Sequence, residues 1–244
     1  EAMLLGDTGY PSGPRLQTAV ASFAADRWGW LFDPAQAISV TDVMTGVIES
    51  IKQLSKPGDP VILTPPIYPP FTMVANMLER PIVPARLGAD GRLDLDALES
   101  AFAAAAKQGS TPILLLSNPH NPTGTVNTRE ELEAVAQLAR KHGARVVSDE
   151  IHAPLVMPTS TFTPYLSVRG TEPDVSMISA SKGWNLAGFK AAVVIPGTDA
   201  IEQIKPIDHR MGTHPGHIAV IAHSAAFDNA RPWLDDAIAG IDVN

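Results

Sequence analysis

The sequence predicts an α/β fold of three layers, α/β/α, in which helices cover both faces of a mainly parallel sheet. Two observations lead to this prediction. Short and almost continuously apolar segments alternate with longer segments of helical periodicity, and this alternation is typical of parallel strands that are buried on both faces. The chain also has 244 residues, of which 45% are hydrophobic, and this is enough for one large domain with a substantial core.

The first half of the chain contains the start of this alternation. Apolar side chains at helical spacing predict a helix at 14–28, and a second helix is expected at 46–55, before Pro57 and Gly58. The segments that follow are a strand at 61–64, a helix at 70–79, a strand at 82–85, a helix at 94–106 that Asp94 opens, and a strand at 113–117.

The second half continues the pattern. Thr128 and Glu131 have the spacing of a capping box, which predicts the start of a helix at 129–142. Residues 199–240 are expected to be helical. Further strands are expected at 146–148, 175–178 and 191–195, with glycine and proline between the elements.

Composition narrows the possible functions. Lysine and arginine number 18 against 26 acidic residues, a net charge of −8 without a basic block, which argues against nucleic-acid binding. The absence of cysteine excludes disulfides and thiolate metal sites. No apolar stretch approaches the roughly 20 residues of a membrane span, and no signal peptide is recognised, so a cytoplasmic protein that does not bind membranes is expected.

Lys182 is the residue with the clearest chemical potential. It lies in Ser-Ala-Ser-Lys-Gly-Trp, between two apolar strand-like segments. A lysine that loses hydration in such surroundings has a lowered pKa, and its neutral amine can attack a carbonyl carbon to form a Schiff base. The alternative is an ordinary lysine at the end of a strand that reaches solvent. The segment by itself leaves both interpretations open.

Two other segments place polar residues where a buried strand ends. Asn121 lies in Ser-Asn-Pro-His-Asn-Pro-Thr-Gly, and Asp149 lies in Val-Val-Ser-Asp-Glu-Ile-His; ligands of open α/β sheets bind at this edge. In combination with Lys182, these segments resemble the fold-type I family of pyridoxal-phosphate-dependent enzymes, the aminotransferase class I/II group. The Asp-Glu-Ile-His form, which ends at His152, is similar to the MalY/PatB branch of cystathionine and cysteine-S-conjugate β-lyases.

The resemblance implies pyridoxal 5′-phosphate as the cofactor and gives roles to three residues. Lys182 would hold the cofactor as an internal aldimine and later remove the substrate α-proton. Asp149 would keep the ring nitrogen protonated, although a helix N-cap is the alternative and Glu150 is the competing carboxylate. Asn121 would donate a hydrogen bond to the phenolic oxygen, and it is also a turn former.

Three aromatic residues are assigned by the same resemblance. His152 stands where many aminotransferases of this group have a tyrosine that donates to the phenolic oxygen, with a structural histidine as the alternative. Tyr68 would stack on the pyridine ring, although the neighbouring Pro69 replaces a second tyrosine of the branch. Tyr10 would reach the phosphate of the other subunit across a dimer interface, which implies a homodimer; a loop tyrosine without a role is the alternative.

The phosphate of the cofactor needs donors and a cation. The segment Thr45-Gly46-Val47 is expected to open a helix, whose free N–H groups attract an anion. Ser179 and Ser181 would add hydroxyl groups, or serve only as local caps. Lys190 stands where the family usually has an arginine or a lysine against the phosphate, and a solvated charge is the alternative.

Three histidines could be imagined as metal ligands. His209, His214 and His217 do not have the spacing of a helical ligand pair, and Pro215 interrupts them. They are expected to form a loop, and no metal site is predicted.

The expected activity is a carbon–sulfur β-lyase reaction on cystathionine or cysteine S-conjugates, which converts the amino-acid substrate to pyruvate, ammonia and a thiol. A class I/II aminotransferase is the alternative, and a noncatalytic regulatory protein on the same scaffold is a third. Family members are longer than this chain. Residues 1–230 are therefore assigned to the large cofactor-binding domain, and 231–244 to the start of a connection to a small C-terminal domain that is expected to be missing, together with the arginine for the substrate carboxylate.

Overall fold

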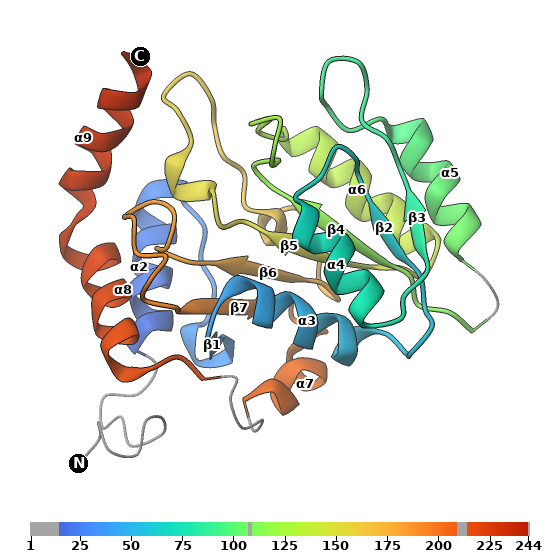
Figure 1. The fold of residues 1–244 in the computed structure, drawn as a ribbon, viewed down its shortest axis with the longest axis horizontal. Coiled ribbons are helices and arrows are strands. Elements are labelled where there is room, and N and C mark those ends of the chain that lie inside the picture. The colour runs from blue at the N-terminus through green and yellow to red at the C-terminus, as the bar shows by residue number, and fades with distance from the viewer. Residues whose placement is uncertain (1–14, 107–108, 209–213, 244) are drawn as a thin grey trace.

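Seven strands form one mixed sheet within the part of the chain that the structure, a computed structural model, describes: residues 15–106, 109–208 and 214–243. Their spatial order is β1-β7-β6-β5-β4-β2-β3 (Figure 1). The strands are β1 (Ile38–Val40), β2 (Val61–Leu63), β3 (Ile82–Pro84), β4 (Ile113–Ser117), β5 (Arg145–Asp149), β6 (Val175–Ile178) and β7 (Ala192–Pro196). β2 to β6 pair in parallel, and β7 is antiparallel to both of its neighbours. The predicted mainly parallel sheet is confirmed.

Helices cover both faces of this sheet. α3 (Val43–Leu54), α4 (Pro69–Met77) and α7 (Ile201–Ile204) pack in one apolar cluster, and α5 (Leu95–Ala105) and α6 (Arg129–Lys141) pack in another. α2 (Arg15–Trp28), α8 (His217–Asn229) and α9 (Arg231–Asp242) form a third cluster with β6 and β7. Figure 1 shows α3 and α7 on one side of the sheet and α5 and α6 on the other. Short 3₁₀ helices are η1 (Pro34–Gln36), η2 (Ala153–Leu155), η3 (Tyr165–Ser167) and η4 (Lys205–Ile207).

Two predicted helix starts are confirmed. Asp94 caps α5, since its side chain accepts a hydrogen bond from Ala97 N at 2.9 Å. Thr128 and Glu131 form the capping box of α6, in which each side chain accepts a hydrogen bond from the backbone N–H of the other residue. These caps satisfy amide groups that have no acceptor within the helix.

The helix expected at 46–55 begins earlier than predicted. α3 starts at Val43, because the Asp42 side chain accepts a hydrogen bond from Thr45 N at 2.7 Å and caps the helix. Gly46 therefore lies inside the helix, where a Cβ atom would be 3.0 Å from Val194 Cγ2. Glycine at this position lets α3 lie close to the sheet. The preceding strand β1, Ile-Ser-Val, was not predicted from the sequence, and it becomes a strand by pairing with β7.

Within the described residues of the region 199–240, helical structure is present as expected, but it is divided into separate segments. α7 spans 4 residues and is followed by η4, while α8 and α9 are separate helices. Pro206 lies in η4, and Pro215 lies shortly before α8. Proline has no backbone N–H to donate, so it interrupts regular helical hydrogen bonding.

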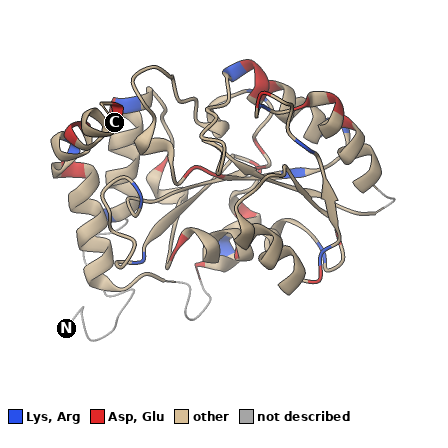
Figure 2. Ribbon diagram, turned by 45° about the horizontal axis from the view of Figure 1, so that its top comes forward, with Lys and Arg blue, Asp and Glu red and all other residues tan. Residues whose placement is uncertain are grey.

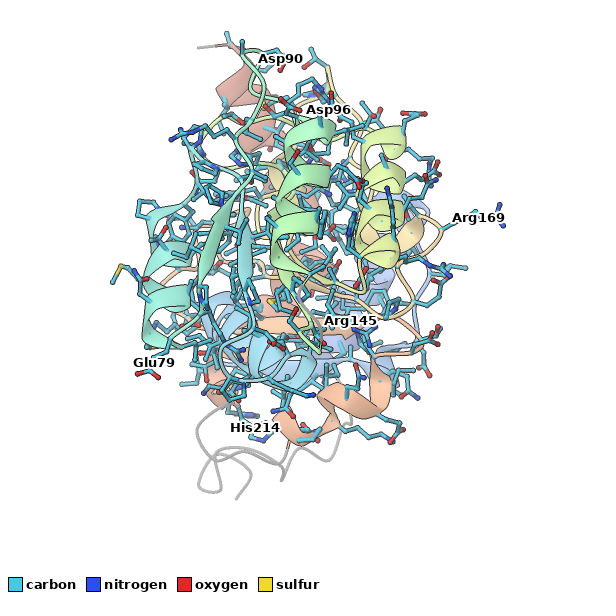
Figure 3. All side chains as sticks on the ribbon, turned by 90° about the vertical axis from the view of Figure 1, so that its right-hand side faces the viewer. Glu79, Asp90, Asp96, Arg145, Arg169 and His214 are labelled. Carbon is cyan, nitrogen blue, oxygen red and sulfur yellow. The ribbon has the colours of Figure 1, made fainter. Side chains whose placement is uncertain are left out.

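Charged residues lie mainly on the outer helices and loops, and acidic and basic residues are interspersed (Figure 2). Asp90 and Arg169, for example, project away from the body of the molecule (Figure 3). Within the described ranges, no helix has both the length and the apolar composition needed to cross a membrane.

The directions of the strands bring distant segments to one edge of the sheet. β4 and β5 are parallel, with Ser117 opposite Asp149, and β6 runs in the same direction beside β5. Since β7 runs the opposite way, the connection from β6 to β7 lies at the carboxyl edge of the parallel strands. The segments after β4, β5 and β6 therefore meet at the edge where α/β sheets bind ligands.

Candidate active site

A cavity of about 170 Å³ lies at this edge. Its walls come from the start of α3, from the segments after β2, β4 and β5, and from the connection between β6 and β7. The lining residues are Asp42, Val43, Met44, Tyr68, Ser117, Asn121, Asp149, Ile151, His152, Ser179, Ser181, Lys182, Ala187, Lys190 and Ala191. Most of the residues selected from the sequence are thus brought together.

Lys182 lies in the connection between β6 and β7, and its side chain is exposed in the cavity. The turn around it is held by Trp184, whose backbone N–H donates to Ala180 O at 3.0 Å and whose indole N–H donates to Ala230 O at 2.8 Å. Of the two interpretations of the sequence, the exposure of Lys182 agrees with the solvent-accessible lysine, because the turn leaves the side chain accessible. A carbonyl compound in the cavity can therefore reach the amine.

Asp149 is the buried acidic residue of the cavity. It is only 6% exposed, and its Oδ1 accepts a hydrogen bond from Ile151 N at 3.0 Å. Burial raises the pKa of this carboxyl group to about 6, although the Ile151 N–H and the positive charge of Lys182 act in the opposite direction. A cationic nitrogen of a ligand beside Asp149 would favour the ionised carboxylate.

Glu150, the competing carboxylate, does not line the cavity. Its Oε1 accepts hydrogen bonds from Tyr165 N at 2.7 Å, from Ser148 Oγ at 3.2 Å and from Asn118 Nδ2 at 3.3 Å. The residue is fully buried, and burial raises the pKa of its carboxyl group to about 8. Of these two carboxylates, Asp149 is the one that can meet a ligand.

Asn121 lies in a loop after β4 that Ser117 holds in place. Ser117 Oγ donates a hydrogen bond to Pro119 O at 3.1 Å and accepts one from Asn121 N at 3.2 Å. Asn118 fixes the start of the same loop, since its Nδ2 donates to Thr163 O at 3.1 Å. Asn121 is therefore both a residue of a turn and a residue of the cavity wall, as the two interpretations of the sequence allowed.

His152 and Tyr68 supply aromatic side chains to the cavity. His152 follows β5 at the start of η2, and burial, together with the charge of Lys182, lowers the pKa of its imidazole below 6.5. Tyr68 precedes α4 and packs edge-on against Phe71, with ring centroids 5.7 Å apart and an interplanar angle of 85°. A neutral imidazole and a phenol ring can both contact an aromatic ligand.

Ser179 and Ser181 make the local hydrogen bonds that were the alternative to a cofactor role. The Ser179 hydroxyl donates to Ala191 O at 2.7 Å and accepts from Ser181 N at 3.1 Å. Ser179 thus ties the end of β6 to the start of β7. Both serines also line the cavity, so their local hydrogen bonds are compatible with contact to a ligand.

The expectation that the segment Thr45-Gly46-Val47 opens the helix is wrong, because α3 begins at Val43. The segment also does not line the cavity. Thr45 N and Gly46 N already donate to Asp42, at 2.7 and 3.0 Å, and Val47 is buried in the core. The cavity is lined at this helix start by Asp42, Val43 and Met44 instead. The sequence signal for them is an aspartate directly before an apolar helical segment.

Asp42 and Lys190 form an ion pair at this end of the cavity. Lys190 Nζ lies 3.1 Å from Asp42 Oδ2, and the Lys190 and Asp42 side chains are 64% and 30% exposed. Burial opposes ionisation of Asp42, but hydrogen bonds from Thr45 and Lys190 outweigh it and hold the pKa of the carboxyl group below its ordinary value. A cation and the N-terminus of α3 therefore lie together, with a carboxylate between them.

A second cavity of about 400 Å³ adjoins the first and shares Asn121 and His152 with it. Its further lining is mostly apolar or small and consists of Pro119, His120, Pro122, Gly124, Val126, Leu155, Val156, Met157, Thr159 and Ser160. The two cavities thus meet at the pair of polar side chains after β4 and β5.

Two residues selected from the sequence, Tyr10 and His209, lie outside the described residues. Of the other two histidines considered as metal ligands, His214 places Nε2 2.8 Å from Asp208 O. Over the described ranges, no group of three His, Cys, Asp or Glu side chains could hold a metal ion.

The residues of the first cavity fit pyridoxal 5′-phosphate, the cofactor that the sequence resemblance implies. The Lys182 amine can condense with an aldehyde, and the buried Asp149 can accept a hydrogen bond from a protonated ring nitrogen. Lys190 and the N-terminus of α3 can bind a phosphate. An amine, a buried acid and a cationic end thus stand around one cavity, while the roles of individual residues remain predictions.

Comparisons with known proteins agree with this fit. A family model described as aminotransferase class I and II matches residues 7–241. A relative from Mycobacterium leprae named "Putative cystathionine beta-lyase" is 47% identical over 244 residues, which cover 98% of this chain and 60% of the relative. Cystathionine beta-lyase PatB of Bacillus subtilis is 32% identical over 243 residues, which cover 94% of this chain and 60% of that protein.

Solved structures give the same picture. Cystalysin from Treponema denticola, whose crystal structure contains a pyridoxal 5′-phosphate cofactor, aligns with a TM-score of 0.86 and 27% identity over 97% of this chain and 61% of its own. The chain spans about 60% of the length of the curated relatives that it matches.

Proposed function

Since the chain belongs to the aminotransferase class I and II family, we propose that it is the catalytic part of a pyridoxal-phosphate-dependent carbon–sulfur β-lyase that acts on cystathionine or cysteine S-conjugates. The observation that carries the proposal is the single cavity that Lys182 shares with Asp149, Asn121 and His152. The names of the Mycobacterium leprae and Bacillus subtilis relatives support the lyase activity.

In this proposal, the residues of the cavity would hold the cofactor at its aldehyde, its ring nitrogen, its phenolic oxygen and the face of its ring. Lys182 would bind the aldehyde of the cofactor, and Asp149 would keep its ring nitrogen protonated. Asn121 and His152 would donate hydrogen bonds to the phenolic oxygen, and the Tyr68 ring would pack on the pyridine. When bound, pyridoxal phosphate supplies an electron sink for the α-carbon of an amino acid.

Lys182 is also the proposed base. With the substrate amine in its place, the Lys182 amine would take the α-proton of the substrate. The C–S bond at the β-carbon then breaks, and the sulfur leaves with the bonding electron pair and is protonated to a thiol. Hydrolysis of the remaining three-carbon fragment by water gives pyruvate and ammonia. No amino-group acceptor is needed, which distinguishes this reaction from transamination.

The second cavity offers space for the substituent on the sulfur atom. It joins the first at Asn121 and His152, and the Leu155-Val156-Met157 segment contributes apolar side chains. An apolar compartment next to the reacting carbons would bury the alkyl part of a thiol leaving group and so favour cysteine conjugates over small polar amino acids.

The proposed enzyme is a homodimer with the active site at the subunit interface. Met73 and Met77 on α4 are 68% and 60% exposed, and this helix begins directly after Tyr68 at the cavity. Exposed apolar side chains beside a site favour burial by a partner. Analytical ultracentrifugation of the protein tests whether it forms a dimer. Sedimentation as a monomer alone would contradict this part of the proposal. The cytoplasmic location expected from the sequence stays a prediction.

Pyruvate release tests the activity. The purified full-length protein, loaded with pyridoxal 5′-phosphate, is incubated with cystathionine in the absence of any keto acid, and pyruvate and thiol are measured. Equal amounts of both products are expected, and Lys182→Ala is expected to form neither. Product that forms only after a keto acid is added would instead support the aminotransferase alternative.

A further inference from the structure

The Asp42–Lys190 ion pair lies at the end of the cavity where the cofactor phosphate is proposed to bind. Asp42 Oδ2 is 3.1 Å from Lys190 Nζ, and Asp42 Oδ1 accepts a hydrogen bond from Thr45 N at 2.7 Å. One carboxylate therefore interacts with both features that attract an anion here, the lysine ammonium group and the first turn of α3. Both side chains line the cavity.

We propose that Asp42 weakens the binding of the cofactor phosphate, because its carboxylate competes with the phosphate for Lys190 and for the N-terminus of α3. This inference rests on the proposed function, since it requires pyridoxal phosphate in the cavity. Asp42 is then a residue that sets cofactor affinity without a part in the bond-breaking steps.

Asp42 has two effects of opposite sign on a bound phosphate. It orients Lys190, which favours binding, and it carries a negative charge, which opposes binding. The orienting effect is small, because exposed ion pairs contribute little and the Lys190 side chain is 64% exposed. The repulsion is larger, because a phosphate monoester carries about −1.5 to −2 charges and would share donors with the carboxylate. The net effect of Asp42 is therefore weaker binding.

The other charged residues of the cavity act on a different part of the cofactor. In the proposed function, Lys182 binds the aldehyde and Asp149 binds the ring nitrogen, and both groups are present in pyridoxal as well as in pyridoxal 5′-phosphate. Pyridoxal lacks only the phosphate. A comparison of the two ligands therefore isolates the contribution of the phosphate end.

The substitution Asp42→Asn tests the inference. Asparagine is as good an N-cap as aspartate, so the start of α3 is retained while the charge is removed. Dissociation constants are measured for both ligands by titration of the visible absorbance of the protein-bound cofactor, at fixed pH and ionic strength. Asp42→Asn is expected to bind pyridoxal 5′-phosphate about three- to tenfold more tightly and pyridoxal with unchanged affinity.

Asp94→Asn is the matched control. Asp94 caps α5 in the same way, through Ala97 N at 2.9 Å, but it does not line the cavity. Its substitution is expected to leave both dissociation constants unchanged. Lys190→Gln is expected to weaken the binding of pyridoxal 5′-phosphate and to leave that of pyridoxal unchanged.

Two results would overturn the inference while the proposed function stands. One is unchanged or weaker binding of pyridoxal 5′-phosphate by Asp42→Asn, and the other is an equal gain for pyridoxal. Failure of the proposed function gives a different result. In that case, the unsubstituted protein would show no absorbance band that depends on Lys182, with either ligand. The inference would fall with it.

Discussion

Asp149 and Glu150 are consecutive residues, yet Asp149 lines the cavity and Glu150 does not; Glu150 is fully buried, and its Oε1 accepts a hydrogen bond from Tyr165 N. Both residues continue the hydrogen-bond ladder of the sheet, since Asn118 N donates to Asp149 O and Glu150 N donates to Met177 O. Successive side chains of an extended strand point to opposite faces. The geometry of the strand therefore separates the acid that can meet a ligand from the acid that holds the loops.

Lys182→Ala is expected to abolish covalent binding of pyridoxal 5′-phosphate. Borohydride converts a carbon–nitrogen double bond between the cofactor and Lys182 to a stable amine, and mass spectrometry of peptides then locates the added mass. Lys141→Ala is the control, because Lys141 pairs with Glu99 at 2.8 Å on the surface and its substitution is expected to leave the labelling unchanged. Labelling of Lys182→Ala to the same extent at another lysine contradicts the assignment.

Asp149→Asn is expected to lower kcat/KM by about 10²-fold or more, because a neutral amide cannot stabilise the protonated ring nitrogen.

The same change, Asp149→Asn, is expected to stabilise the cofactor-free protein. Burial raises the Asp149 pKa from 3.8 to about 6, so the folded state loses stability as the pH rises through this window. Above pH 6, the free energy of unfolding of Asp149→Asn is therefore expected to exceed that of the unsubstituted protein by about 3 kcal/mol. Urea denaturation measures this difference. A variant that is less stable at neutral pH would contradict the raised pKa.

Glu150→Gln is expected to change how stability depends on pH. The pKa of Glu150 is raised from 4.5 to about 8, so the folded state keeps a proton that the unfolded state has lost, and the free energy of unfolding falls as the pH rises between these values. The neutral amide of the variant would remove this loss, which amounts to roughly 3–5 kcal/mol at the upper end. Urea denaturation at a series of pH values measures the slope. The exposed Glu130 on α6 is the control, and Glu130→Gln should leave the slope nearly unchanged.

His223→Ala is expected to lower the free energy of unfolding by about 2–4 kcal/mol. His223 on α8 is fully buried, and its Nε2 lies 2.5 Å from Phe189 O in the segment that leads to Lys190. Loss of this contact leaves a cavity and a carbonyl group without its partner. Chemical denaturation measures the effect, and a loss below about 0.5 kcal/mol would show that the contact is dispensable.

The same histidine makes the original protein sensitive to acid. Burial lowers the His223 pKa below its ordinary value of 6.5, so the unfolded state binds a proton that the folded state does not. Stability is therefore expected to fall as the pH drops below about 6.5. In His223→Ala, the loss of stability below about pH 6.5 should be absent. If the variant still loses stability in this pH range, other titratable groups cause the loss.

Patterns of neighbouring residues were sufficient to predict several helices and strands of the fold. The capping residues Asp94 and Thr128 and the continuous apolar segment Ile113–Ser117 are each recognisable within a few residues, because capping and burial on both faces of a strand depend on neighbouring side chains. β1 was not predicted, because its three residues form a strand only by pairing with β7, which is distant in the sequence.

The sequence by itself determined the alternation of elements and the residues Lys182, Asn121 and Asp149 at strand ends, because periodicity and short motifs are properties of neighbouring residues. Only the tertiary structure decided that Lys182 is exposed in a cavity, that Asp149 rather than Glu150 lines it, and that α3 begins directly after Asp42. It also decided the pairing of Asp42 with Lys190 across 148 positions. The antiparallel direction of β7 brings these two side chains to the same edge, and strand direction is set by packing of the whole sheet rather than by any local pattern.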